Sequence, residues 1–137
     1  MKHKISKFKI TSGTDANQML EKKLVRNFVE HGYMTTTITK ASYLKSLIES
    51  LVARALKYSE AKKNILLPFF GTEKSVLVFV EIAKQRAKDG IPSGVVRILK
   101  LGERMGDAAP MAKITWTHEI VNLTKVTKKE VVAKKTK

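Results

Sequence analysis

The spacing of apolar residues changes along this 137-residue chain at KDGIPSG, residues 88–94, a cluster of turn-forming residues. Most of the chain before this cluster has apolar residues at every third or fourth position, the repeat of an α-helix that buries one side. After it, VVRILKL (95–101) and MAKITWT (111–117) alternate as β-strands do. The sequence therefore predicts a single small α+β domain, with helices packed on a small mixed sheet that includes a C-terminal β-hairpin.

The first expected elements are a helix and a short strand. Asp15 is the predicted N-cap of the helix, with Gln18 three residues later in the spacing of a capping box. Gly32 is expected to end this helix, because glycine adopts the left-handed conformation after a helix at little cost. The segment YMTTTI, residues 33–38, is a predicted strand because it is β-branched, aromatic and too short for a helix.

Three further helices are expected before the turn cluster. Residues 40–58 have the clearest helical spacing of apolar residues, and Thr39 is the predicted N-cap. A shorter helix is expected over residues 59–70, ending near Pro68 because proline lacks the amide proton that a helix interior needs. Thr72 is predicted to cap the last of these helices.

The segment GERMGDAAP, residues 102–110, is expected to form the loop of an antiparallel hairpin. Alternation along the preceding strand places Arg97 and Lys100 on opposite faces. We predict that Lys100 and Arg104 contact phosphate near the loop, with ordinary surface charge as the alternative. Asp107 is expected to hydrogen-bond backbone within the turn, because no nucleophile or base accompanies it to build a catalytic site.

The net charge points to a class of partner. The chain has 27 Lys and Arg against 12 Asp and Glu, which gives +15. Like charge of this size opposes a compact fold unless a polyanion neutralises it, so a nucleic acid is the expected partner. Lysine outnumbers arginine by 22 to 5. Because arginine makes the bidentate contacts that distinguish guanine, this balance favours recognition of shape and backbone over sequence.

Both ends of the chain are strongly basic. Residues 1–12 contain four lysines and no acid, and they are a predicted nucleic-acid-binding arm, with a solubilising tail as the alternative. Residues 118–137 contain six lysines and two glutamates, a tail expected to give mainly non-specific screening. The predicted folded domain therefore covers residues 13–117.

Several classes of function lack the residues that they need. The absence of cysteine excludes disulfides and thiolate metal sites, and it fits a reducing cytoplasm. His3, His31 and His118 are scattered, so no metal or other cofactor is expected. No apolar run reaches the roughly 18 residues that span a membrane, and no secretory signal is evident. Neither a membrane nor a small-molecule substrate is expected as a partner.

Tyr33 and Trp116 lie on predicted strands, and two roles are open for them. Either ring can stack on an unpaired base of a nucleic acid. Aromatic residues on short strands more often belong to a protein core. We expect core packing for both residues.

The segment GVVRILKLGERMGDAAPMAKI, residues 94–114, closely resembles the C-terminal motif of the bacterial-type large ribosomal subunit protein family L17. The start MKHK, the segment EHGYMTTTITKA at residues 30–41 and the long helix after it resemble the same family in the same order. The similarity covers residues 1–117. It is specific because the C-terminal motif is long.

The resemblance implies a structural ribosomal protein of the cytoplasm, not an enzyme, that binds large-subunit ribosomal RNA near the peptide exit tunnel and contacts neighbouring large-subunit proteins. It also implies a small α+β body with an N-terminal arm that enters RNA. Flexible basic ends suit such a partner, because folded RNA is recognised mostly by shape, phosphate and 2′-hydroxyl contacts. The residues predicted to bind RNA are Lys2, His3, Lys4, Lys7, Lys9, Arg26, Thr36, Thr37, Lys40, Arg97, Lys100 and Arg104.

Two other functions fit part of the pattern. A small DNA-binding architectural protein would use the same charge, and a preference for ribosomal RNA over duplex DNA of equal length would distinguish the two. Salt dependence would not, because both partners are polyanions. An RNA-modifying enzyme would need a pocket with a perturbed titratable group or a cofactor, and nothing in the sequence indicates one.

Overall fold

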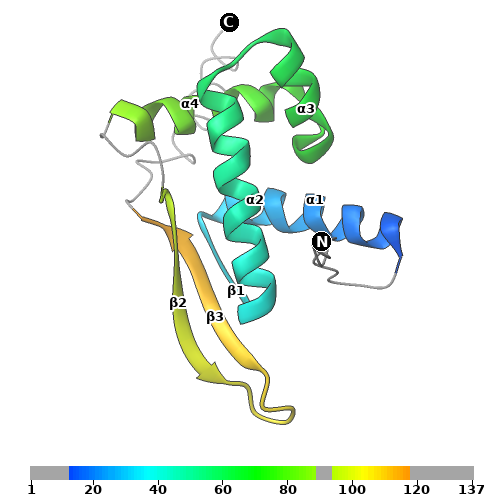
Figure 1. Ribbon diagram of the computed structural model, residues 1–137, viewed down its shortest axis with the longest axis vertical. Helices are drawn as coiled ribbons and strands as arrows, with labels where there is room; N and C mark the ends of the chain where they lie inside the picture. Colours follow the sequence, from blue (N-terminus) through cyan, green and yellow to red (C-terminus); the bar gives the residue numbers. More distant parts are fainter. Residues whose placement is uncertain (1–12, 89–93, 118–137) are drawn as a thin grey trace, which may run out of the picture.

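Four helices and three strands make up the part of the chain that the structure, a computed structural model, describes: residues 13–88 and 94–117 (Figure 1). In chain order the elements are α1 (Thr14–His31), β1 (Tyr33–Thr37), α2 (Ile38–Leu56), α3 (Glu60–Phe70), α4 (Glu73–Lys88), β2 (Val96–Glu103) and β3 (Pro110–Trp116). The α+β class and the C-terminal hairpin are confirmed. The predicted arm, residues 1–12, and the predicted tail, residues 118–137, lie outside the described residues.

The three strands form one sheet in the order β1-β3-β2, with β3 in the centre. β2 and β3 are the predicted hairpin, and β1 pairs with the other edge of β3. The prediction of a mixed sheet is wrong in one respect, because both described pairs are antiparallel. β1 and β2 run in the same direction, but β3 lies between them, so no parallel pair forms.

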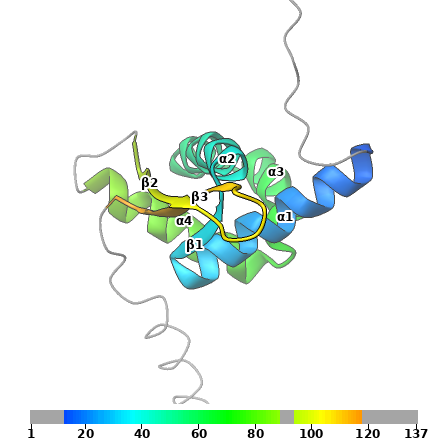
Figure 2. The same cartoon turned by 90° about the horizontal axis from the view of Figure 1, so that it is seen from below.

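α2 is the central helix of the fold. It packs against each of the other helices and strands, and Figure 2 shows it lying over one side of the hairpin. This position explains why its apolar residues recur at helical spacing, since each turn must contribute to the core. The buried residues of α2 are Ala41, Leu44, Ile48, Leu51, Val52 and Ala55.

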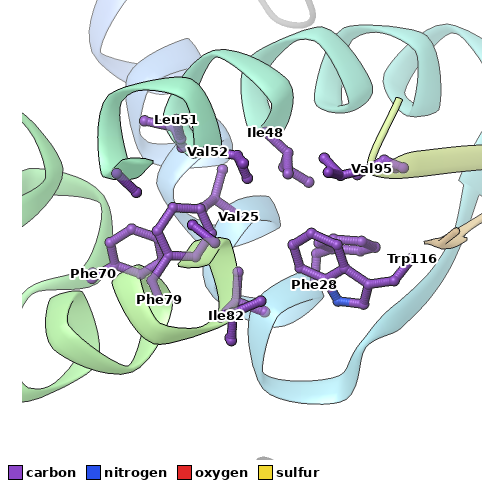
Figure 3. Packing of buried hydrophobic residues seen from close by; sticks show 14 of the residues in the cluster. Val25, Phe28, Ile48, Leu51, Val52, Phe70, Phe79, Ile82, Val95 and Trp116 are labelled. Carbon is purple, nitrogen blue, oxygen red and sulfur yellow. The ribbon is translucent and has the colours of Figure 1, made fainter. Parts of the chain in front are cut away.

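Two aromatic pairs lie in the core. Phe28 of α1 packs on Trp116 of β3 with ring centroids 4.8 Å apart, and Phe70 of α3 packs on Phe79 of α4 at 4.7 Å. Figure 3 shows both pairs, with Val52 of α2 above them. Such tilted pairs add about 0.5–1.5 kcal/mol each beyond the burial of their area. The Phe28 contact fixes the central strand to the helices, so one face of the sheet must point away from them.

The first helix differs from prediction at its start and agrees at its end. α1 begins at Thr14, and Gly13 is its N-cap with no side-chain hydrogen bond, so the prediction that Asp15 caps the helix is wrong. Asp15 lies inside the first turn, where its carboxylate is favoured by the positive end of the helix. Gly32 ends the helix as predicted, with φ at 75° and its N–H donating to the Phe28 carbonyl at 2.8 Å.

The starts of α2 and α4 give one correction and one confirmation. Thr37, not Thr39, is the N-cap of α2, because β1 runs into this helix without a loop. The strand is therefore one residue shorter than predicted. Thr72 caps α4 as expected, with Oγ1 accepting a hydrogen bond from the Ser75 amide at 3.3 Å.

α3 continues past its proline. Pro68 lies inside the helix, which ends at Phe70; the predicted span of residues 59–70 is therefore confirmed at its end, and the expectation that the proline ends the helix is wrong. The missing amide proton costs a hydrogen bond only in the last turn, where the helix is about to end in any case. Gly71 then closes α3 in the left-handed conformation, with φ at 77° and its N–H donating to the Leu67 carbonyl at 2.7 Å.

Candidate nucleic-acid interface

One face of the sheet packs on the helices, and the other is at least partly exposed. Directly opposed residues on neighbouring strands share a face, so the pairing register assigns each strand residue to a side. The helix-facing side includes Met34, Val96, Ala112, Ile114 and Trp116, all buried. The other side, called the open face, consists of exposed or half-buried residues: Tyr33, Thr35, Thr37, Arg97, Leu99, Met111, Lys113 and Thr115.

Two cations on the open face are held by neutral side chains. Lys113 Nζ lies 4.8 Å from the centroid of the Tyr33 ring, a distance at which the electron-rich ring face attracts an ammonium group. The two residues are diagonal neighbours, because Lys113 is directly opposite Thr35. Arg97 donates from Nε to Thr115 Oγ1 at 3.3 Å. Neither contact neutralises its cation, so both charges remain available to an anion.

The surroundings of these cations contain little negative charge. Across the three strands that the structure describes, the one acidic residue is Glu103, at the far end of β2. Neither Arg97 nor Lys113 forms an ion pair with any residue of 13–88 or 94–117. A surface with cations and no carboxylates attracts phosphate by its potential and by direct contact. The open face is therefore suited to a nucleic-acid backbone.

The two strand aromatics have different environments. Trp116 is 5% exposed and packs on Phe28, which confirms the expected core role. Tyr33 is 57% exposed and lies on the open face, so the expectation of core packing is wrong for it. The cause is the register of β1 against β3, which turns Met34 toward the helices and its neighbour Tyr33 away from them.

The predicted contact residues of the hairpin lie on different sides. Arg97 is opposite Thr115 and Lys100 is opposite Ala112, so the two cations are on opposite faces, as alternation predicts. Lys100 shares the side of the buried Ala112 and is nevertheless exposed. It belongs to β2, an edge strand of the sheet, and Figure 1 shows that the hairpin formed by β2 and β3 projects beyond the N-terminal end of α2.

The other predicted contact residues within the described ranges do not gather at one place. Thr36 shares the helix-facing side of Ala112, whereas Thr37 lies on the open face. Arg26 of α1 donates from Nε to the Phe69 carbonyl at 2.7 Å, a contact that ties α1 to the last turn of α3. Lys40 is half-buried in the first turn of α2. The predicted contact residues of the arm, which lie outside the described residues, are Lys2, His3, Lys4, Lys7 and Lys9.

Arg104 has a carboxylate partner within the hairpin loop. Its Nε donates to Asp107 Oδ1 at 3.1 Å and its Nη2 donates to Oδ2 at 2.6 Å, a bidentate pair. Two backbone hydrogen bonds close the same loop: the Arg104 N–H donates to the Ala109 carbonyl, and the Ala108 N–H donates to the Arg104 carbonyl. The Ala109 N–H also donates to Asp107 Oδ1 at 3.3 Å, which confirms the predicted backbone contact of Asp107. Arg104 thus differs from Arg97, because a carboxylate balances its charge.

The electrostatics of the loop follow from this pair. The hydrogen bond from Arg104, aided by the Ala109 amide, lowers the pKa of Asp107 from 3.8 to about 2. Gly102 and Gly106 have φ values of 96° and 103°, conformations that residues with a side chain rarely adopt. The glycines therefore serve the geometry of the turn.

The described residues offer no reaction centre built on a metal. No group of three or more His, Asp or Glu side chains in residues 13–88 and 94–117 is arranged to hold a metal ion. None of the helices in that part of the chain has the length and apolar character to cross a membrane. Together, the fold and the open face define a small basic α+β domain that presents cations on one side of its sheet.

Comparison with known proteins gives the family. A family model described as "Ribosomal protein L17" matches residues 20–117. The large ribosomal subunit protein bL17 of Neorickettsia sennetsu is 35% identical over 115 residues, which cover 83% of this chain and 97% of the relative. The bL17 proteins of Rickettsia canadensis and Methylacidiphilum infernorum are 34% and 33% identical, over 89% and 86% of this chain and 89% of each relative. The chain belongs to the ribosomal protein L17 family.

Family membership confirms three expectations from the sequence. The resemblance of the segment at residues 94–114 is confirmed, because the matched region includes it. The chain is a ribosomal protein and not an enzyme. Its expected location, the ribosome in the cytoplasm, is also confirmed by the bacterial relatives.

Proposed function

We propose that this chain is a structural constituent of the large ribosomal subunit that binds large-subunit ribosomal RNA and supports subunit assembly near the peptide exit tunnel. Family membership supports the ribosomal role, and the relatives are large-subunit proteins by name. The observation that carries RNA binding is the open face, where Arg97 and Lys113 are held by neutral partners with no described carboxylate beside them.

The open face offers two kinds of contact to an RNA backbone. Arg97 bonds to Thr115 through Nε, and its terminal nitrogens, which bond to no residue that the structure describes, suit a bidentate contact with phosphate. Lys113 supplies a point charge that the Tyr33 ring keeps on this side of the sheet. Thr35 lies on the same face, directly opposite Lys113, and its hydroxyl suits 2′-hydroxyl or phosphate oxygens. The proposed recognition is therefore of backbone and shape.

Other basic residues extend this contact. The arm, residues 1–12, is proposed to enter RNA and to make contacts that a folded surface cannot reach. Lys100 provides a cation on the other side of the hairpin. The tail, residues 118–137, adds screening charge, and adjacent large-subunit proteins are further partners.

A competition experiment tests the proposal. The labelled full chain is titrated with protein-free large-subunit ribosomal RNA at two salt concentrations, in competition with duplex DNA of equal length. We expect the RNA to be preferred at least tenfold and its affinity to fall steeply with salt, because phosphate contacts release counterions. Equal affinity, or a preference for the duplex, would support the architectural DNA-binding alternative instead.

A further inference from the structure

The tip of the hairpin, residues 101–108, presents apolar side chains to solvent. Met105 is 99% exposed and Leu101 is 55% exposed. The hairpin that carries both residues projects beyond α2 (Figure 1). An isolated exposed apolar residue is ordinary. Met105 is unusual because almost all of its side chain is held away from the body of the protein.

The loop that carries Met105 has a defined conformation. The bidentate pair between Arg104 and Asp107 spans it, and backbone hydrogen bonds of 2.9 and 3.0 Å join Arg104 to Ala109 and Ala108. Met105 lies between the two members of the pair in the chain. A loop that is already ordered loses less conformational entropy when it docks, so its contacts convert more fully into affinity.

The charge of the tip differs from that of the whole chain. Arg104 and Asp107 balance each other, and Glu103 forms no ion pair with any described residue. The tip is therefore slightly negative in a chain of net charge +15. A phosphate backbone would be repelled by Glu103 and would find no unpaired cation among residues 101–108. The tip also has no aromatic ring on which a base could stack.

From these observations we propose that the hairpin tip docks on a neighbouring ribosomal protein, with Met105 in an apolar pocket and Glu103 against a basic rim. The inference rests on the proposed ribosomal function and names the partner class of one of its surfaces. Methionine suits such a pocket because its unbranched side chain adapts to irregular shapes. A protein can supply both the pocket and the basic rim, and an RNA backbone supplies neither.

Two probes separate a protein contact from an RNA contact. The first probe is large subunits depleted of this chain and verified to contain the other large-subunit proteins, and the second is protein-free large-subunit ribosomal RNA, which lacks them. The labelled full chain is bound to each probe as wild type and as Met105→Ala, with Met105→Leu as the matched control. Met105 is fully exposed, so circular dichroism of both variants should match the wild type.

We expect Met105→Ala to weaken binding to the depleted subunits about five- to thirtyfold, the range for truncation of an anchoring side chain. Met105→Leu should stay within about twofold, and neither variant should change the affinity for protein-free RNA. If Met105→Ala lowered the affinity for both probes equally, the tip would contact RNA. If it lowered the affinity for neither probe, Met105 would make no contact. Either result would overturn the proposal.

Reversal of the nearby charge gives an independent check. Glu103→Lys should weaken binding to the depleted subunits, because it places a cation against the basic rim, and it should leave or increase the affinity for protein-free RNA. Stronger binding to both probes would overturn the proposal. If the wild-type chain bound neither probe, the proposed function itself would fail, which is a different outcome from each of these.

Discussion

The two ends of the hairpin hold arginine in opposite ways. On the open face, Arg97 is held by the hydroxyl of Thr115, and its charge stays uncompensated. At the tip, Arg104 is held by the carboxylate of Asp107, and its charge is balanced. Whether an arginine can bind phosphate therefore depends on the side chain that holds it, and a basic residue in the sequence does not establish this by itself.

Positioning a cation and neutralising its charge are separate effects in this domain. Tyr33 and Thr115 restrict where Lys113 and Arg97 lie without removing their charge, which lowers the entropy lost on binding an anion. Asp107 restricts Arg104 more tightly and removes the net charge of the pair. The first arrangement suits a nucleic-acid contact, and the second suits a rigid loop.

The largest effect should come from the two cations of the open face. Replacement of both, Arg97→Gln with Lys113→Gln, should lower the affinity for protein-free large-subunit RNA on the order of 100-fold, since each charged contact is worth roughly tenfold or more. The plot of log affinity against log salt should become shallower by about 1 to 2. Fluorescence titration at several salt concentrations measures both quantities.

The matched control for this prediction removes the same charge elsewhere. Lys74→Gln with Lys84→Gln changes two exposed lysines of α4, which is not part of the sheet. The RNA affinity of this variant should fall much less than that of the open-face variant. Equal losses in the two variants would mean that only net charge matters, and the open face would have no special role.

A smaller effect should follow from the ring that positions Lys113. Tyr33→Leu removes the cation–π contact, worth about 0.5–1 kcal/mol at an exposed site, and should weaken RNA binding about two- to fivefold. Tyr33→Phe keeps the ring and should bind as the wild type does. The same titration measures both. If Tyr33→Phe lowered the RNA affinity as much as Tyr33→Leu, the hydroxyl of Tyr33, and not its ring face, would be the group that supports RNA binding.

Removal of the balanced pair at the tip should leave RNA binding almost unchanged. The double variant Arg104→Gln with Asp107→Asn keeps the net charge and should stay within about twofold of the wild type on protein-free RNA. Its loop should be looser, so the Ala108 amide, which donates to the Arg104 carbonyl, should exchange hydrogen faster. A large loss of RNA affinity would show that Arg104 does contact phosphate, against this account.

The smallest effect concerns pH. The Arg104 contact lowers the pKa of Asp107 from 3.8 to about 2, so the ionised pair favours the folded loop fully above the ordinary carboxyl pKa. This contribution should decline as the pH falls below 3.8 and be lost as it falls through about 2, while at pH 5 the loop should be unchanged. Carboxyl chemical shifts of Asp107 recorded by NMR across this range test the prediction. A midpoint near 3.8 would mean that the pair does not hold in solution.

Local signals in the sequence predicted much of the fold. The helical spacing gave the four helices, and the glycine after α1 and the threonine before α4 set boundaries that the structure keeps. The alternation after the turn cluster gave the hairpin and the opposite faces of Arg97 and Lys100. These features depend on residues close together in the chain, for which propensity and periodicity suffice.

Features that depend on distant residues were not predicted. The pairing of β1 with β3 brings Tyr33 beside Lys113, eighty positions later in the chain, and no local pattern specifies that register. The expectation that Tyr33 is a core residue failed for this reason. The continuation of α3 past Pro68 is a different case, because the proline falls where the helix already ends and its penalty is small.

The ion pair between Arg104 and Asp107 could have been predicted from the sequence. The two residues are three apart in a glycine-bearing loop, a spacing at which a turn brings side chains together. The backbone contact of Asp107 was predicted and is confirmed, but the ion pair was not considered. A basic residue close to an acidic residue in the same loop is thus a poor candidate for phosphate binding, because the two can form an ion pair.

The most direct test of the account is cross-linking inside the assembled particle. A photoreactive residue replaces Thr35, on the open face directly opposite Lys113, in the full chain, and large subunits that contain it are purified and irradiated. We predict a covalent product with large-subunit ribosomal RNA from this position, and a product with protein from the same probe at Met105. A protein product alone from position 35, or no product, would contradict the assignment of the open face to RNA.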